Sequence, residues 1–286
     1  MGGVGIIAAV VISSLIWSGG ISSQLMIILL CGILFALVGW TDDLLKLIRR
    51  SSDGLSVRQK LLMQFLCAVL ITAVLYARSG LELTQLYIPW FFQQPVDIGP
   101  VYYLLAVLYI MMLVNSVNLT DGLDGLAAGL GIISFTAALI VAVAGISVIP
   151  GIRSGIESIP GAGDIAVASA GVIGALWGFL MFNRKPARLF MGDTGSQAVG
   201  GILAVCAIML RSEVVFLFIS GMFLIETVSV ILQVSSWKLR HKRVFKMAPL
   251  HHHFELAGKS EISIVRVFWG IGALFSAAGV CIILFG

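Results

Sequence analysis

Long apolar runs alternate with short polar stretches along the whole chain. A helix that crosses the hydrocarbon core of a bilayer needs about 20 mostly apolar residues. Counted in this way, the pattern predicts nine membrane-spanning helices, at residues 3–18, 23–40, 59–78, 101–117, 122–146, 163–182, 195–210, 213–236 and 262–285. We therefore expect an all-α, polytopic transmembrane bundle in which residues 1–286 form a single integral-membrane domain.

The segment 82–100 departs from this pattern. Pro89, Pro95 and Gly99 lie among residues that favour strands, which predicts a short hairpin. The aromatic residues of the same segment also suit the interface between membrane and water. Both interpretations are open at this point.

The composition strengthens the membrane interpretation. The chain of 286 residues is 59% hydrophobic and 11% charged, whereas a soluble domain is about half apolar and about a quarter charged. The net charge of +4 indicates no nucleic-acid partner, because the placement of the charges follows the predicted topology. The cysteines lie far apart in apolar runs without zinc-site or CxxC spacing, so we interpret them as small buried side chains: Cys31, Cys67, Cys206 and Cys281.

Basic residues gather on one side of the predicted bundle. The opposite side carries only Arg78, Arg153 and Arg211. By the positive-inside rule the basic side faces the cytoplasm, so the chain begins inside and ends outside. The basic side comprises the loops 41–58, 118–121, 183–194 and 237–261.

Four polar motifs meet on this cytoplasmic side, each beside the end of a predicted span. The first is WTDDLLKL, in which Asp42 and Lys46 share a face of a continued helix while Asp42 and Asp43 point about 100° apart. An ordinary charged helix end also explains this motif when it is taken alone.

The second motif, NLTDGLDGLAAG, places Asn118, Asp121 and Asp124 at every third position. Asp121 could cap the helix that follows, and Gly122 and Gly125 remove side chains that would block the approach of a ligand. A cap with small-residue helix packing explains Asp121 and the glycines. It does not explain Asp124, one turn into an apolar helix, where an acid is costly and usually functional.

The third motif, FNRKPARLFMGDTGS, ends one helix at Pro186 and begins another near Asp193, Thr194 and Ser196. Its glycines, hydroxyls and basic residues suit an anion, although the order of a P-loop is absent. A basic loop at the membrane edge is the alternative.

The fourth motif, MAPLHHHFELAG, carries three adjacent histidines inside the chain. Adjacent histidines do not easily bind one zinc ion together, and no cysteine lies nearby. Hydrogen bonding to a phosphate or proton transfer fits them better.

Five acids and several lysines on one side indicate a hard, oxygen-ligated cation beside an anionic substrate. Mg²⁺ fits, because it takes one or two carboxylates and leaves its other positions to water and phosphate oxygens. The chemistry implied is phosphoryl transfer, in which positioning and charge neutralisation do most of the work. A substrate reached from inside by an almost wholly membrane-embedded enzyme is expected to be joined to a lipid.

The motifs TDDLLK, NLTDGLDGLA, KPARLFMGDTGS and PLHHHFE, in this order at span boundaries, resemble those of the phospho-N-acetylmuramoyl-pentapeptide transferases. These belong to the polyprenyl-phosphate N-acetylhexosamine-1-phosphate transferases. The resemblance implies transfer from UDP-N-acetylmuramoyl-pentapeptide to undecaprenyl phosphate, giving lipid I and UMP for peptidoglycan synthesis. It also implies Mg²⁺, a ten-span helical fold that is usually homodimeric, and a cytoplasmic cleft at the bacterial inner membrane.

The resemblance assigns roles residue by residue. Asp193 is the expected Mg²⁺ ligand, Asp42 the base or activator for the lipid phosphate, and Asp43 and Asp121 complete the acidic centre. Asp42 would need its pKa raised by acidic neighbours to act as a base. Both direct attack and a covalent aspartyl intermediate fit these residues, and we favour direct attack.

The remaining assignments concern the substrate. Lys46, Lys60 and His251 are candidate diphosphate contacts, His251 is also a candidate catalytic residue, and His252 and His253 are further substrate contacts. Phe190 is expected to stack on uracil. The nucleoside pocket is expected to comprise Asn118, Gly122, Leu123, Asp124, Asn183 and Phe190.

The start of the chain departs from the family pattern. The family has an additional N-terminal span, then a cytoplasmic loop that ends in Pro-Thr-Met-Gly-Gly, and this chain begins MGGVG. We expect that the chain lacks the family's first span, through truncation or through a start assigned at an internal methionine. The missing loop supplies basic and hydroxyl groups near the nucleotide.

Two other functions remain open. A related transferase could move N-acetylglucosamine-1-phosphate instead, although PLHHHFE argues for the muramoyl-pentapeptide branch. A transporter would need ionisable residues near the bilayer midplane, where only Glu226 is clearly placed. We favour a groove or a helix interface as the setting of Glu226.

Overall fold

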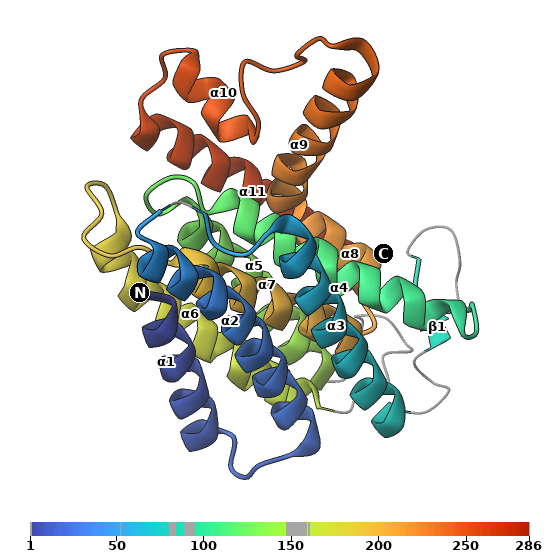
Figure 1. The fold of residues 1–286 in the computed structure, drawn as a ribbon. Coiled ribbons are helices and arrows are strands. Elements are labelled where there is room, and N and C mark those ends of the chain that lie inside the picture. The colour runs from blue at the N-terminus through green and yellow to red at the C-terminus, as the bar shows by residue number, and fades with distance from the viewer. Residues whose placement is uncertain are drawn as a thin grey trace.

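The computed structural model describes residues 2–51, 53–79, 84–88, 95–146, 159 and 161–285. These residues form a bundle of helices with one small antiparallel hairpin (Figure 1). The predicted all-α bundle is confirmed. The helices are α1 (Gly2–Trp17), α2 (Ser23–Arg49), α3 (Val57–Ser79), α4 (Val101–Thr120), α5 (Leu126–Ile146), α6 (Ala162–Asn183), α7 (Gly192–Met209), α8 (Glu213–Ile219), α9 (Gly221–Arg240), α10 (Leu250–Leu256) and α11 (Glu261–Phe285).

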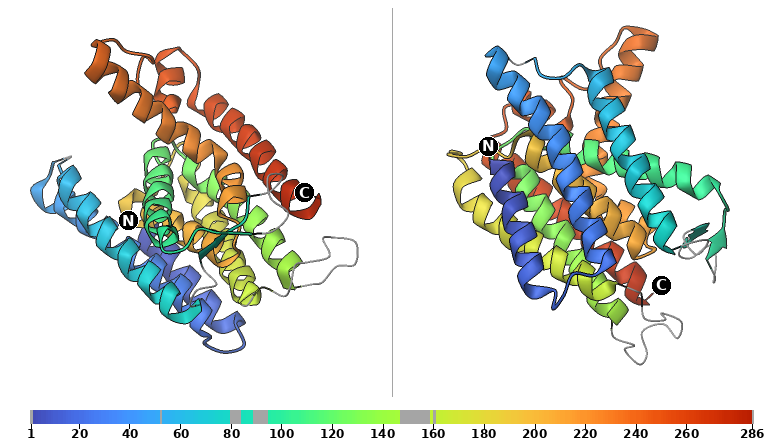
Figure 2. Two further views of the ribbon diagram at one scale, coloured as in Figure 1. Left: turned by 90° about the vertical axis from the view of Figure 1, so that its right-hand side faces the viewer. Right: turned by 60° about the horizontal axis from the view of Figure 1, so that its bottom comes forward.

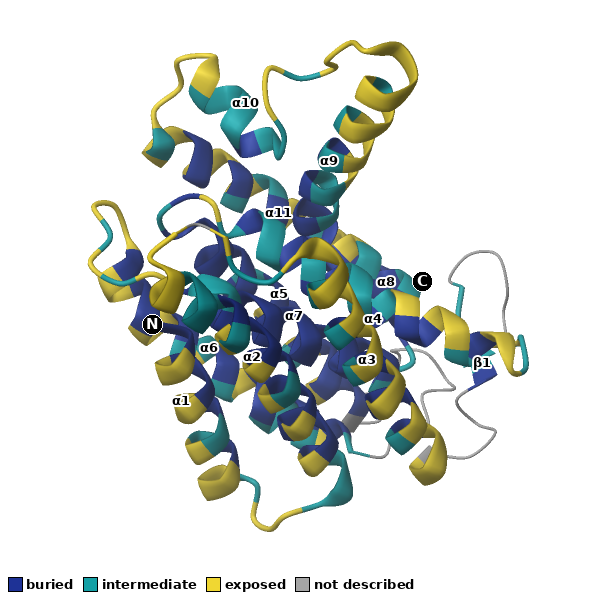
Figure 3. Cartoon of the chain, viewed as in Figure 1, coloured by how far each residue is buried: buried dark blue, intermediate teal, exposed yellow. Residues whose placement is uncertain are grey.

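Within the described residues, seven helices are long and apolar enough to cross a membrane: α2, α3, α4, α5, α6, α9 and α11. α1 is a shorter apolar helix. Large apolar side chains cover the outer faces of the bundle, where Figure 3 shows exposed residues along the helices. Leu37 of α2, Ile140 of α5 and Leu274 of α11 are among them. Such surfaces suit lipid, so the chain is a multi-pass membrane protein.

The prediction of one span at 213–236 is wrong, because α8 ends at Ile219 and α9 begins at Gly221. The break leaves the carbonyl of Ile219 without a helical partner. Two hydroxyls from other helices donate to it, Ser134 Oγ at 3.1 Å and Ser276 Oγ at 3.0 Å. A carbonyl in a membrane needs an internal donor, so these two serines stabilise the break.

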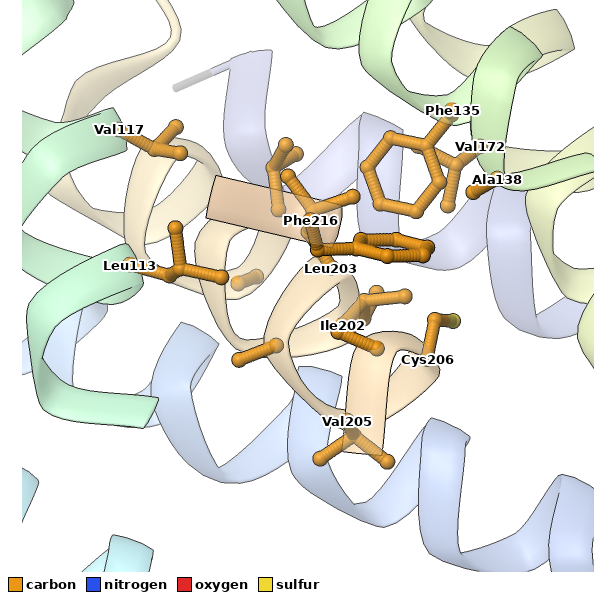
Figure 4. Packing of buried hydrophobic residues seen from close by; sticks show 14 of the residues in the cluster. Leu113, Val117, Phe135, Ala138, Val172, Ile202, Leu203, Val205, Cys206 and Phe216 are labelled. Atoms are coloured by element: carbon orange, nitrogen blue, oxygen red, sulfur yellow. The ribbon is translucent and has the colours of Figure 1, made fainter. Parts of the chain in front are cut away.

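α7 is the central helix of the bundle. Every residue from Thr194 to Ile208 is buried, and α7 packs against α1, α2, α4, α5 and α6. In Figure 4, Leu113 and Val117 of α4 lie on one side of α7, and Phe135 and Val172 lie on another. The burial of α7 fixes its polar N-terminus against the helices around it.

Small residues allow this close packing. A Cβ added at Gly200 would lie 2.7 Å from the Cα of Val114, so the backbones of α7 and α4 are nearly in contact. Gly39 of α2 likewise lies against the backbone of Asp193, where an added Cβ would be 2.1 Å from the carbonyl oxygen. Small residues serve membrane helices in this way.

The polar motifs lie together at one end of the bundle, where α2, α4 and α6 end and α3, α5 and α7 begin; we call it the polar end. α10 and the last turns of α9 extend beyond the other helices at the same end (Figure 1). The grouping predicted from the alternation of spans is therefore confirmed.

The predicted hairpin is also confirmed. β1 (Gln85–Leu86) pairs antiparallel with β2 (Val96–Asp97), in the register Gln85 with Asp97 and Leu86 with Val96. It lies between the end of α3 and the start of α4, away from the polar end, as the two views of Figure 2 show. Residues 89–94, with Pro89 and most of the aromatic residues of the segment, lie outside the described residues, as does Arg153.

The prediction of four buried cysteines is wrong for Cys281. Cys31 and Cys206 are buried and Cys67 is half-buried, but Cys281 is exposed on α11. On the outside of a membrane bundle an apolar run faces lipid, so apolar sequence around a cysteine does not by itself imply burial in protein.

Candidate functional site

The carboxylate of Asp193 is the meeting point of the polar end. Lys46 Nζ lies 3.1 Å and Lys60 Nζ 2.8 Å from its Oδ2, and Asn118 Nδ2 donates to its Oδ1 at 2.7 Å. These partners come from α2, α3 and α4, while Asp193 lies in the first turn of α7. Residues predicted separately for metal, diphosphate and nucleoside binding thus share one contact network. Asn118, which was predicted for the nucleoside pocket, contacts the Asp193 carboxylate in this network.

Asp42 is covered by the loop that follows α2. Its side chain is nearly inaccessible, Oδ2 lies 2.5 Å from Lys46 Nζ, and Oδ1 accepts a hydrogen bond from the Leu55 amide at 2.7 Å. The prediction that Asp42 and Lys46 share a helix face is confirmed. Gly54 allows this closure, since an added Cβ would lie 2.5 Å from Oδ1.

Asp43 reaches across to the start of α7. Its Oδ1 accepts from the amide of Asp193 at 3.2 Å, and its Oδ2 accepts from the amide and hydroxyl of Thr194 at 3.0 and 2.7 Å. A carboxylate at a helix N-terminus satisfies free amides and complements the helix dipole. Asp43 therefore caps α7 from a neighbouring helix and fixes the backbone that carries Asp193.

Asp42, Asp43 and Asp193 are close enough to hold a metal ion together. Each offers one carboxylate oxygen, and these oxygens lie within 4.8 Å of one another. No other such group of histidine, cysteine or acidic residues occurs among the residues that the structure describes. An all-oxygen donor set fits a hard cation that leaves positions for phosphate oxygens. The neighbouring lysines provide positive charge at the same place.

Asp121 does not cap α5, and that prediction is wrong. It follows the last turn of α4, where its amide donates to the Asn118 carbonyl at 3.3 Å, and α5 begins only at Leu126. Burial, together with the charges of Asp193 and Asp43, raises the pKa of Asp121 well above its usual range, and a hydrogen bond from the Gly192 amide partly opposes this. Asp121 thus belongs to the same acidic region without joining the close group of three.

Asp124 lies in the turn before α5, and not one turn into an apolar helix as predicted. Gly125 has φ of 80°, a left-handed conformation that keeps the helix from starting earlier. The Asp124 carboxylate accepts from the Ala187 amide at 3.0 Å, and its own amide donates to Glu261 at 2.8 Å. It therefore ties the loop between α6 and α7 to the α4–α5 turn.

Asn183 makes a second tie between the same segments. It is buried at the end of α6, where Oδ1 accepts from the Gly125 amide and Nδ2 donates to the Leu189 carbonyl, both at 2.9 Å. Glu261 of α11 completes the arrangement by pairing with Lys185. We call these three connected parts, the turn 121–125, the loop 184–191 and the first turn of α11, the loop cluster.

Leu123 and Phe190 have opposite settings in the loop cluster. Leu123 is buried, whereas Phe190 leaves 67% of its surface exposed, so its ring is free to receive a flat ligand. The backbone near Phe190 is held by the first helix, because the Gly2 amide donates to the Phe190 carbonyl at 2.9 Å and the Gly3 amide donates to Met191 at 3.1 Å.

The three histidines contact different partners. His251 is buried beside Glu226, with Nδ1 3.0 Å from its carboxylate, and a Cβ added at Gly122 would lie 2.3 Å from His251 Nε2. His252 Nδ1 lies 2.6 Å from Glu255, and His253 Nδ1 accepts from the Lys246 amide at 3.1 Å. His251 alone reaches toward the α4–α5 turn.

Glu226 lies at a helix interface, as favoured above. It is fully buried in α9, and its oxygens accept from the amides of Leu250 and His251 at 2.5 and 3.2 Å. Its carboxylate therefore caps the short helix α10. Both carboxylate oxygens contact residues of α10, which accounts for the burial of this acid.

A buried polar layer lies one turn deeper than Asp193 and escaped the sequence analysis. Gln64 Nε2 donates to Gln197 Oε1 at 3.0 Å, and Asn115 Nδ2 donates to Gln64 Oε1 at 2.9 Å. Their spacing was the available signal, since Gln64 and Gln197 follow Lys60 and Asp193 by four residues. The contacts of Glu261 were not predicted either, because an acid in the first turn of a helix is a common feature of helix starts.

The cavity of about 890 Å³ between α1 and α6 is separate from the acidic region. Gly5 and Ala9 line it from α1 and Gly174 and Gly178 from α6, with Phe182 nearby. Its walls carry none of the predicted acids, lysines or histidines and are mostly apolar, with the polar side chain of Ser13 among them.

Comparison with known proteins adds to this geometry. Residues 25–211 match the family model described as glycosyl transferase family 4. Curated relatives named phospho-N-acetylmuramoyl-pentapeptide-transferase include one from Borrelia turicatae (strain 91E135), 41% identical over 276 residues that cover 96% of this chain and 79% of the relative. Those of Geobacillus kaustophilus (strain HTA426) and Halalkalibacterium halodurans (strain ATCC BAA-125 / DSM 18197 / FERM 7344 / JCM 9153 / C-125) are 42% and 43% identical, covering 99% and 96% of this chain and 82% and 80% of their own lengths.

Proposed function

Because the chain belongs to glycosyl transferase family 4 and to the phospho-N-acetylmuramoyl-pentapeptide-transferases, we propose that it transfers phospho-N-acetylmuramoyl-pentapeptide from UDP-N-acetylmuramoyl-pentapeptide to undecaprenyl phosphate. The products are lipid I, a peptidoglycan precursor, and UMP. The observation that carries the proposal is the meeting of Asp193, Asp42 and two lysines at the polar end. Acids for a cation and lysines for phosphates are what a diphosphate substrate needs.

The lysines bind the diphosphate in this mechanism. Lys46 and Lys60 both lie on Asp193 in the structure, so they are in place to neutralise an anion that arrives beside it. An oxygen of the lipid phosphate attacks the phosphorus that carries the sugar, and a new P–O bond forms. The bond from that phosphorus to the UMP oxygen breaks, and the electron pair leaves on UMP.

Asp42 is the group that accepts a proton from a singly protonated lipid phosphate. Its carboxylate lies next to Lys46 and within reach of the acidic centre. Asp43, whose oxygens are bonded to the start of α7, acts by holding Asp193 in place. Direct attack needs no covalent bond to any of these acids.

Mg²⁺ is the cation we propose for this centre. Asp193 would supply a carboxylate oxygen to the ion, with the oxygens of Asp42 and Asp43 close by, and Asp121 lies in the same acidic region. When bound, the ion neutralises charge that develops on the phosphate oxygens.

The loop cluster is the nucleoside site in this proposal. Phe190 supplies an exposed ring for stacking on uracil, and Gly122 and Leu123 lie in the turn 121–125. Asp124 and Asn183 shape the pocket through backbone contacts, since their polar atoms bond to Ala187, Gly125 and Leu189. His252 and His253 of α10 are half-buried and remain candidates for contacts to the rest of the substrate.

In this proposal the protein lies in a bacterial inner membrane, with its polar end toward the cytoplasm. The support is the concentration of lysine and arginine at this end, as the positive-inside rule requires. We propose further that the protein acts as a homodimer, as its resemblance to the family implies.

An assay with both substrates tests the proposal. The full chain in detergent, supplied with UDP-N-acetylmuramoyl-pentapeptide, undecaprenyl phosphate and Mg²⁺, should release UMP and form lipid I. UDP-N-acetylglucosamine in place of the muramoyl donor should release none. Release from UDP-N-acetylglucosamine alone would assign the chain to the other branch, and no release from either would overturn the transferase proposal.

A further inference from the structure

Glu226 is a buried acid that the proposed reaction does not use. It has no exposed surface, lies in the apolar stretch FLIETVSV of α9, and bonds to α10 through three contacts. Two of these contacts are to backbone amides at the start of α10, and capping of that helix explains them. The third, to the ring of His251, needs a separate explanation.

We propose that Glu226 is a positioning residue that fixes the ring of His251, so that Nε2 faces the substrate at the turn 121–125. This rests on the proposed function, because the substrate is the UDP-sugar. Glu226 does not touch the substrate and acts only through His251.

The contact with Glu226 determines which ring nitrogen carries hydrogen. Nδ1 of His251 lies 3.0 Å from Glu226 Oε1, and a carboxylate only accepts hydrogen bonds. Nδ1 therefore donates. A carboxylate that orients a histidine through one nitrogen leaves the other for chemistry, as at metal and catalytic sites.

Nε2 of His251 has no partner in the described residues. It is buried, and no hydrogen bond reaches it. Unpaired buried polar atoms are rare in proteins and require an explanation. Such an atom next to a predicted binding turn indicates that its partner is a ligand.

Gly122 lies directly beside this atom. A Cβ added there would be 2.3 Å from Nε2, so the glycine is what allows the ring and the turn to meet. Gly122 itself is exposed and follows Asp121 of the acidic region. A polar group of the UDP-sugar that lies on this turn is the partner that the geometry assigns to Nε2.

The substitution Glu226→Gln tests the tautomer without a change of volume. The amide oxygen can take the place of Oε2, which accepts from the Leu250 amide at 2.5 Å. The amide nitrogen then takes the place of Oε1, where it gives up the bond from the His251 amide and meets Nδ1, so the ring hydrogen is forced onto Nε2. We expect kcat/KM for the UDP-sugar to fall about 10- to 100-fold, the usual effect of losing a group that orients a functional histidine. Ser229→Ala is the control, because Ser229 donates only to the Glu226 carbonyl and should leave kcat/KM unchanged.

A double substitution separates positioning from folding. If Glu226 acts through His251, Glu226→Gln should lower kcat/KM strongly in the wild type and little further in His251→Ala. Equal losses in both backgrounds would overturn the proposal. ¹⁵N NMR of protein labelled at histidine gives a direct readout, with the His251 signals assigned by their loss in His251→Ala: in the wild type the His251 ring should be protonated at Nδ1, and Glu226→Gln should move that hydrogen to Nε2.

The NMR signal also separates failure of this inference from failure of the proposed function. If the wild type releases no UMP from any UDP-sugar, the transferase proposal fails, while the spectra still test the pairing of Glu226 with His251. A His251 ring protonated at Nε2 alone in the wild type would overturn the inference even in an active enzyme.

Discussion

Asp193→Asn is the substitution that most directly tests the acidic centre. It removes one negative charge and turns one acceptor oxygen into an amide donor, in a side chain that bonds to Lys46, Lys60 and Asn118. One of these donors must then face another donor. The shape of the residue is unchanged, and its backbone amide still donates to Asp43.

The size of the effect follows from the two lysine contacts. Hydrogen bonds to charged groups contribute about 1.5–3 kcal/mol each. The side chain of Lys46 is 36% exposed and that of Lys60 19%, so solvent screening brings their sum to about 3 kcal/mol. Since about 1.4 kcal/mol corresponds to a factor of ten, turnover should fall about a hundredfold from lost positioning alone. Loss of a cation ligand would add to this.

UMP release at saturating substrate, measured across a series of Mg²⁺ concentrations, is the assay. Asp97→Asn is the matched control, because Asp97 lies in the hairpin away from the polar end. Both variants should remain folded at the assay temperature, as thermal melting will show, although Asp193→Asn should melt several degrees lower because it loses the same lysine contacts in the folded protein. Turnover of Asp193→Asn within a few-fold of wild type, with an unchanged Mg²⁺ requirement, would refute the reasoning.

Three further outcomes test the rest of the site. Phe190→Ala should weaken UDP-sugar binding, measured by calorimetry, by about 5- to 150-fold, because stacking on a base contributes about 1–3 kcal/mol; an unchanged affinity would count against stacking by this exposed ring. A chelator of divalent cations should stop UMP release and added Mg²⁺ should restore it, whereas activity in excess chelator would end the case for a cation at the three acids. Asp121→Asn should raise the melting temperature at neutral pH without Mg²⁺, because the raised pKa of Asp121 means that its ionisation costs the folded state stability. That gain should shrink as the pH falls toward the usual pKa of an aspartate, and a gain independent of pH would exclude this cause.

Some of the fold was predictable because lipid imposes a simple length rule. Eight of the nine predicted spans each correspond to one helix, and the grouping of the motifs at one end follows from alternation alone. The pair Asp42 and Lys46 was predictable because both lie on one helix at local spacing. Each of these predictions depends on neighbours in sequence.

The predictions that failed depend on partners far away in sequence. The break at Ile219 is stable only because Ser134 and Ser276 donate to its carbonyl, and neither serine marks itself as a donor in the sequence. Asp124 looked like a charge inside a membrane helix because its partners, the Ala187 amide and Glu261, lie 63 and 137 residues away in the sequence. The hydropathy of a segment does not record such tertiary contacts.

Asp43 combines a local feature that the sequence predicts with a distant contact that it does not. It follows Asp42 in sequence and looks like its duplicate, yet the α-helix turns it about 100° away, toward the start of α7. There it accepts from the Asp193 amide and from Thr194. The position of the Asp193 carboxylate therefore depends on Asp43, while Asp42 is left to face Lys46. Two adjacent acids of one motif thus take different roles: Asp43 holds α7 in place and Asp42 faces Lys46. The helix points them in different directions, and the packing of α7 against α2 gives Asp43 its partners.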